Sequence, residues 1–182
     1  MIPEYNDTLY CLILDHHRFQ DNPLSLVFQN EALPELVRLF DDTILQDVAE
    51  EGPWCLFLTP ESLFITEQLL VELWGNDKYW QGGAVLVVGL PEQNESSLLE
   101  WIRSRALALS SDGNISVFRF YSPTLLSRIS ENASQEDLDH LLRGVRSIIW
   151  SAGQRSVDVF SSERAAVGTY QLPEALQKGL ME

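Results

Sequence analysis

The stretch Ser116-Val-Phe-Arg-Phe-Tyr-Ser-Pro123 joins an expected strand directly to an expected helix, and the rest of the chain is interpreted around it. Side chains of an extended chain alternate between two faces, so the two phenylalanines share one face, and Arg119 and Tyr121 lie on the other. Aromatic and β-branched residues favour this geometry. Ser122 is a typical N-cap and Pro123 suits the first helical position, so a helix is predicted immediately after the strand.

Arg119 is the one charged residue inside this stretch. A guanidinium between apolar neighbours must find a partner or extend to water. One interpretation is structural: Arg119 holds the edge of a sheet through a carboxylate or backbone carbonyls. Asp15, another charge beside an apolar strand, is then the first candidate for its partner. The other interpretation is that Arg119 contacts a ligand or a protein partner at the end of a strand.

Strand-like and helix-like segments alternate along the rest of the chain. Beside the opening stretch, strands are expected at Leu9–Leu14, Trp54–Leu58, Gly82–Val88, Ser147–Trp150 and Ser156–Phe160. The first three are continuously apolar, which is typical of strands buried on both faces. Helical segments are expected from Pro23, over Leu33–Phe40, after Asp42 or Thr43, from Thr59 to about Trp74, after Asn94, after Ser134, and from Pro173.

This alternation predicts an α/β fold, namely a single domain with a mostly parallel or mixed central sheet flanked by helices. A chain of 182 residues is long enough for one such domain with a sizeable core. We place the domain at residues 1–152. Residues 153–182 are weakly patterned, and we treat them as a C-terminal extension whose ordering could depend on a partner.

Charge and hydropathy argue against two classes of partner. The net charge is −15 at pH 7, which opposes binding to a nucleic-acid backbone, because that needs clustered Lys and Arg. No apolar run approaches the roughly 18 residues of a membrane span, and no secretory signal is visible at the first residues.

Cys11 and Cys55 lie in apolar runs and are expected to be buried thiols, although neighbouring strands would allow a disulfide. We therefore expect a cytoplasmic protein.

Asp15-His16-His17, at the end of the first expected strand, is the motif most suggestive of catalysis. Carboxylate and imidazole side chains suit a divalent metal, and the motif resembles that of the DHH phosphoesterases. That family takes further ligands from strands upstream, whereas Asp7 is the one Asp or His before this motif. The alternative is a solvent-facing loop.

Other catalytic motifs are missing from the sequence. There is no Gly-x-Ser-x-Gly elbow, no Cys-x-x-Cys and no phosphate-binding glycine loop. We therefore expect a protein that is not an enzyme and has no cofactor and no metal. A small metal-dependent phosphoesterase using Asp15, His16 and His17 is one alternative, and a small-ligand-binding module near Asp15 and Arg119 is another.

Five tryptophans stand mostly at the edges of expected strands and helices: Trp54, Trp74, Trp80, Trp101 and Trp150. Core packing is one explanation, and a partner-binding surface, where Trp, Tyr and Arg concentrate, is the other. The predicted partner contacts are Trp74, Tyr79, Trp80, Arg119 and Tyr121. The predicted structural residues are Asp15, Trp54, Arg119, Ser122 and Pro123.

The order of these landmarks resembles the domain-of-unknown-function family that serves as effector chaperones, or adaptors, of the bacterial type VI secretion system. The resemblance covers roughly Leu9–Trp150. Its most specific parts are Gly52-Pro-Trp54 and Phe118-Arg-Phe-Tyr-Ser-Pro123 at their mutual spacing. Ser122 stands where that family usually has an aspartate.

This resemblance implies a non-enzymatic cytoplasmic protein. Members of the family bind a toxic effector, usually encoded beside them, and help to load it onto the spike protein of the secretion apparatus. The expected function is therefore that of an effector-specific chaperone or adaptor. Its expected partners are the cognate effector protein and the spike protein.

Overall fold

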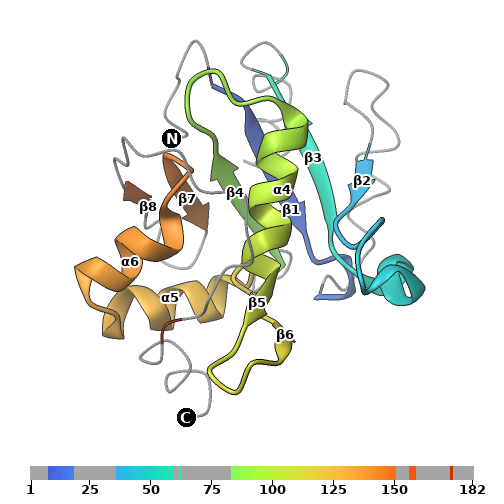
Figure 1. The fold of residues 1–182 in the computed structure, drawn as a ribbon. Coiled ribbons are helices and arrows are strands. Elements are labelled where there is room, and N and C mark those ends of the chain that lie inside the picture. Colours follow the sequence, from blue (N-terminus) through green and yellow to red (C-terminus); the bar gives the residue numbers. More distant parts are fainter. Residues whose placement is uncertain are drawn as a thin grey trace.

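The computed structural model describes residues 8–18, 36–59, 62, 83–150 and 173, together with the backbone of residues 156–158. Its centre is a six-stranded sheet in the order β2-β3-β1-β4-β7-β8 (Figure 1). These strands are β1 (Tyr10–Leu14), β2 (Leu36–Arg38), β3 (Trp54–Leu58), β4 (Ala84–Val88), β7 (Ser147–Trp150) and β8 (Ser156–Asp158). A separate hairpin pairs β5 (Leu107–Leu109) with β6 (Ile115–Val117). The helices bounded within the described residues are α4 (Glu95–Ala106), α5 (Pro123–Asn132), α6 (Gln135–Leu142) and the 3-10 helices η1 (His16–Arg18) and η2 (Gln46–Glu51).

Every described strand pair of the sheet is antiparallel. The predicted fold class, with a mostly parallel or mixed sheet flanked by helices, is therefore wrong. The prediction rested on the alternation of strand-like and helix-like segments, which is typical of parallel sheets but does not fix the direction of the strands. Here β1 and β4 are antiparallel to each other and buried along their whole length. Continuous apolarity reports burial and carries no information on strand direction.

Most of the predicted strands are present, with small differences at their ends. β1, β3, β4, β7 and β8 correspond to the five expected segments outside the opening stretch. The helix predicted over Leu33–Phe40 is wrong, because residues 36–38 form β2, which pairs with β3. The apolar spacing in that segment suits a helix, but pairing with a buried strand overrides it. Predicted helices from Pro23, Thr59 and Pro173 lie largely outside the described residues.

The predicted helix starts at Asn94 and Ser134 are confirmed. The Ser97 N–H donates to Asn94 Oδ1 at 2.9 Å, and the Asn94 N–H donates to Ser97 Oγ at 3.1 Å, which completes a capping box. The Asp137 N–H likewise donates to Ser134 Oγ at 3.2 Å. Ser122 occupies the N-cap position of α5, but its side chain makes no capping hydrogen bond.

The opening stretch differs from its prediction in its middle. The strand β6 ends at Val117, and the chain then turns, with hydrogen bonds from the Phe120 N–H to the Phe118 carbonyl and from the Ser122 N–H to the Arg119 carbonyl, both 2.8 Å. In a continuous strand, side chains would alternate between two faces. The turn instead buries all three aromatic side chains of Phe118–Tyr121 and leaves Arg119 at the surface.

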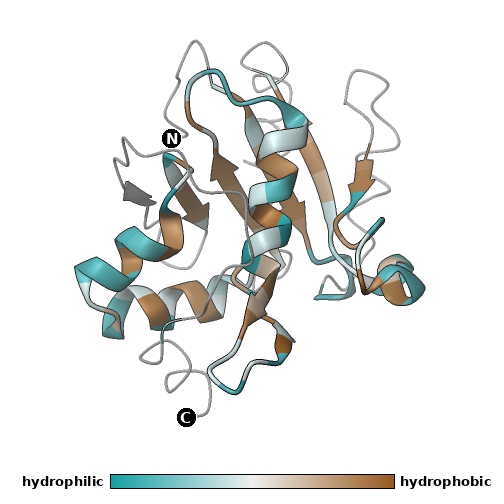
Figure 2. Ribbon diagram, viewed as in Figure 1, coloured by the Kyte–Doolittle hydropathy of each residue, from teal (hydrophilic) through white to brown (hydrophobic). Residues whose placement is uncertain are grey.

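One core joins a face of the sheet to the helices. Phe57, Cys11, Val87 and Ile148 follow one another across four strands and belong to one core with the buried residues of α4, α5 and α6. Figure 2 shows these strands as hydrophobic, and α4, with its mixed hydropathy, crosses in front of them. Both cysteines are free thiols in this core.

The boundary predicted at residue 152 falls before β8, whose backbone pairs with β7. The sheet therefore includes residues on both sides of that boundary. Apart from β8 and Pro173, residues 153–182 lie outside the described part of the chain.

Candidate functional site

Four neighbouring strands, β2, β3, β1 and β4, have a terminus at the same end of the sheet. Leu14 is the Cα partner of both Trp54 and Ala84, and Arg38 is the partner of Trp54. Side chains from the end of β1, from β2 and β3, and from the turn before α5 gather there. We call this set the strand-end surface; it consists of Asp15, His16, Arg18, Arg38, Trp54 and Arg119.

Asp15 is the buried centre of the strand-end surface. Its N–H donates to the Gly83 carbonyl at 2.7 Å, which prolongs the β1–β4 ladder beyond the last strand residue. Its Oδ2 atom accepts a hydrogen bond from Arg119 Nη2 and lies 3.3 Å from Arg18 Nε. The predicted pairing of Arg119 with Asp15 is therefore confirmed, across a separation of 104 residues.

Arg18 and Arg119 are each held by the Asp15 carboxylate but remain partly exposed to solvent. The side chain of Arg119 is 46% exposed and that of Arg18 is 40% exposed, whereas the Asp15 side chain is almost fully buried. A buried carboxylate needs such partners, because an unpaired charge away from water is costly. Burial by itself would lower the pKa of Arg119, but the charge and hydrogen bond of Asp15, helped by Tyr121, raise it. The Arg119 guanidinium thus stays charged while facing solvent.

Tyr121 packs beneath this pair and is itself buried. Burial raises the pKa of Tyr121 to about 12, although the nearby charge of Arg119 acts in the opposite direction. Its ring meets the Phe120 ring nearly edge-on, with centroids 5.8 Å apart. The side chain of Tyr121 therefore ties the turn to the core and offers little surface to a partner.

Trp54 forms the aromatic part of the strand-end surface. The Arg38 guanidinium carbon lies 5.3 Å from the Trp54 ring centroid, within the range of a cation–π contact. Arg38 Nη1 also lies 3.5 Å from Glu50 Oε1. The His16 ring approaches Trp54 edge-on at 6.3 Å. The buried atoms His16 Nδ1 and Trp54 Nε1 have no hydrogen-bond partner within the described part of the chain.

The geometry gives little support to a metal site at Asp15-His16-His17. The two imidazole centroids are 4.0 Å apart, but the Asp15 oxygen beside them is occupied by two guanidiniums, which repel a cation. Burial and the neighbouring His17 lower the pKa of His16, which favours the neutral imidazole that a metal requires, but this does not offset the two guanidiniums at Asp15. Among the residues that the structure describes, no group of three or more His, Cys, Asp or Glu side chains could hold a metal ion.

The predicted contact residues fall into three groups. Arg119 is half-exposed at the strand-end surface and Tyr121 is buried, while Trp74, Tyr79 and Trp80 lie outside the described residues. Of the other tryptophans, Trp101 and Trp150 are core residues.

Sequence reasoning missed Arg18 and Arg38. Arg18 stands three residues after Asp15, at the end of the short helix η1 that directly follows Asp15, which is a usable local signal. To recognise Arg38 as a residue of this surface, one must know that β2 pairs with β3, and that pairing leaves no signal in the local sequence.

Comparison with protein families finds one match. A model described as Domain of unknown function (DUF4123) matches residues 10–140, which is well over half of the chain. The matched range contains every residue of the strand-end surface. Comparisons with curated proteins and with solved structures give no match. Within the described ranges, no helix has both the length and the apolar character needed to cross a bilayer.

Proposed function

The chain belongs to the DUF4123 family, and from this membership and the geometry of the strand-end surface we propose that it is an effector-specific chaperone or adaptor. It binds a type VI secretion toxin and helps to load it onto the spike protein of the secretion apparatus. In this proposal the protein acts in the cytoplasm by binding and is not an enzyme.

The observation that carries the proposal is the grouping of exposed arginines and a tryptophan on a rigid support. Trp and Arg are enriched among the residues that contribute most to protein–protein binding. Arg18 and Arg119 are anchored through a buried carboxylate, and Arg38 is anchored on the Trp54 ring. Side chains held in this way lose less conformational entropy when a partner binds.

The N–H groups of these guanidiniums that face solvent can donate hydrogen bonds to the effector. Each guanidinium has five N–H donors in a planar fork, and Asp15 accepts from one N–H of Arg119. The remaining donors suit carboxylates and backbone carbonyls of a bound segment. Apolar side chains of the effector would cover the exposed part of Trp54. We therefore assign effector binding to the strand-end surface.

Co-expression with the products of the neighbouring genes tests the proposal. A tagged full-length chain should co-purify with a toxin or spike protein encoded beside it and elute with it as one complex. The double variant Arg18→Ala/Arg38→Ala should weaken this complex about 10-fold or more, since each lost contact is worth on the order of 1 kcal/mol. Arg128→Ala, at an exposed arginine on α5, is the matched control and should bind like the wild type.

Two results would overturn the proposal. One is the absence of a stable complex with any neighbouring toxin or spike protein. The other is a complex that the double variant leaves unchanged, which would move the binding surface elsewhere. Circular dichroism and urea denaturation of each variant separate loss of binding from loss of folding.

A further inference from the structure

The segment 39–53, which joins β2 to β3, presents a second surface that borders the strand-end surface at Arg38 and Trp54. Pairing of Arg38 with Trp54 and a 3.0 Å hydrogen bond from the Leu39 N–H to the Pro53 carbonyl close its base. In Figure 1 its helix η2, drawn in cyan, stands away from the sheet at the right of the view. Ile44 is 69% exposed and Val48 is 50% exposed.

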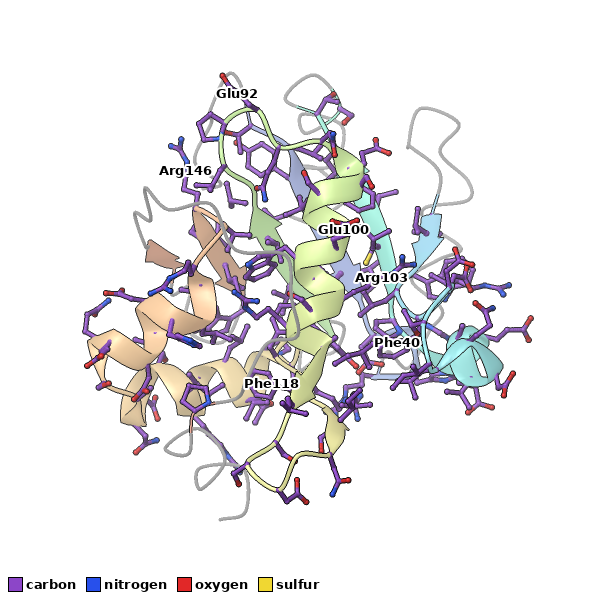
Figure 3. The ribbon with its side chains drawn as sticks, in the orientation of Figure 1. Phe40, Glu92, Glu100, Arg103, Phe118 and Arg146 are labelled. Atoms are coloured by element: carbon purple, nitrogen blue, oxygen red, sulfur yellow. The ribbon has the colours of Figure 1, made fainter. Side chains whose placement is uncertain are left out.

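This exposure is not the result of a loosely held loop. Leu39, Phe40 and Ala49 anchor the segment in the core, and Arg103 of α4 donates to the Leu39 carbonyl at 2.9 Å. Arg103 and Phe40 are labelled in Figure 3. The turn is closed further by a 2.7 Å hydrogen bond from Thr43 Oγ1 to the Phe40 carbonyl. The segment therefore offers its two apolar side chains in a preorganised form, which favours binding.

The charge around the two apolar side chains has one sign. Residues 39–53 contain five carboxylates and neither lysine nor arginine; the carboxylates are Asp41, Asp42, Asp47, Glu50 and Glu51. The one ion pair described for this segment joins Glu50 to Arg38. Such a surface attracts a cationic partner over distance and rejects an anionic one.

The charge also discriminates between occupants. A second copy of this chain would bring the same five carboxylates and a net charge of −15, so self-association through this face is opposed. An anionic lipid surface is opposed for the same reason. We propose that Ile44 and Val48, within their acidic surroundings, form a docking surface for a cationic amphipathic segment of another protein. This surface borders the strand-end surface at Arg38 and Trp54 but contains none of its residues, and the inference does not depend on the function proposed for them.

Binding of designed peptides to the full-length chain tests this inference. The probe is a fluorescent Leu/Lys peptide whose leucines follow the i, i+3, i+4, i+7 spacing of one helical face. Its controls are a shuffled peptide of the same composition and a Leu/Glu peptide with the same leucine spacing. Ile44→Ser/Val48→Ser removes the apolar pair, and Asp47→Asn/Glu51→Gln removes two charges. The matched control is Ile115→Ser/Val117→Ser, because these hairpin residues are 52% and 45% exposed.

We expect the Leu/Lys peptide to bind more tightly than both control peptides. Ile44→Ser/Val48→Ser should weaken it about 10-fold or more, as expected for two partly exposed side chains that become buried. The charge variant should weaken it several-fold, with the larger effect at low salt. The hairpin control should bind like the wild type.

The inference is overturned if the shuffled peptide binds equally well, because attraction would then be a matter of charge alone. Equal binding of the Leu/Glu peptide, or equal loss in the hairpin control, also overturns it. Concentration-dependent self-association that Ile44→Ser/Val48→Ser abolishes would identify a second copy as the occupant instead. Urea denaturation confirms that each variant is folded before it is scored.

Discussion

Replacing Arg119 by alanine removes one of the two guanidiniums that hold the Asp15 carboxylate. Breaking a fully buried ion pair costs about 3–5 kcal/mol, because one charge stays buried without a partner. Two features of this pair reduce that cost. The Arg119 side chain is 46% exposed, so water already screens it, and Arg18 Nε remains 3.3 Å from the same Asp15 oxygen. We therefore expect Arg119→Ala to lower the free energy of unfolding by about 1–2 kcal/mol.

Urea denaturation at pH 7, followed by tryptophan fluorescence, measures this loss. A double-mutant cycle with Asp15→Asn isolates the interaction, for which we expect a coupling energy of about 1 kcal/mol. The coupling should fall in high salt, because the arginine is partly exposed. The exposed Arg128→Ala on α5 serves as the control and should change stability by less than about 0.5 kcal/mol. A coupling energy near zero would refute the view that this ion pair fastens the turn before α5 to the end of the sheet.

Three further predictions concern buried polar and thiol groups. Burial raises the pKa of Tyr121 to about 12, whereas an unfolded tyrosine titrates near pH 10, so its stabilisation is complete below about pH 10 and is lost as the pH rises toward 12. Urea denaturation across that range should show the loss, and Tyr121→Phe should remove it. Arg105→Met should lower the free energy of unfolding by about 2–3 kcal/mol in the same assay, because Arg105 is buried and donates to two backbone carbonyls at the end of α6. Cys11 and Cys55 are buried free thiols, and burial raises the pKa of the Cys11 thiol, so a thiol reagent should modify both only after urea unfolds the chain.

Features that depend on neighbouring residues could be predicted from the sequence. Asn94 and Ser134 cap their helices because the N–H groups that they satisfy lie within three residues of each. The strands β1, β3 and β4 were identifiable because each is a short apolar run between turn residues. The pairing of Arg119 with Asp15 was also predictable, since each is a charge beside an apolar strand and needs a partner.

Features that depend on contacts between distant segments could not be predicted. Strand direction is one, because a continuously apolar strand can be buried in a parallel or an antiparallel sheet. β2 is another, since its apolar spacing suits a helix and the pairing with β3 decides otherwise. The strand-end surface is the third: Arg18, Arg38 and Trp54 come together there only because β1 and β2 end, and β3 begins, at the same end of the sheet.

The sequence alone showed where most strands and helices lie, that both thiols are buried, and that one arginine in an aromatic stretch needs a partner. How that stretch folds depended on the tertiary structure. A continuous strand would have placed its aromatic side chains on two faces, but a turn at Phe118–Tyr121 buries all three and leaves Arg119 outside. The reason is physical: the core formed by the sheet and α4 stabilises the burial of three aromatic rings, and local strand preference is too weak to oppose it.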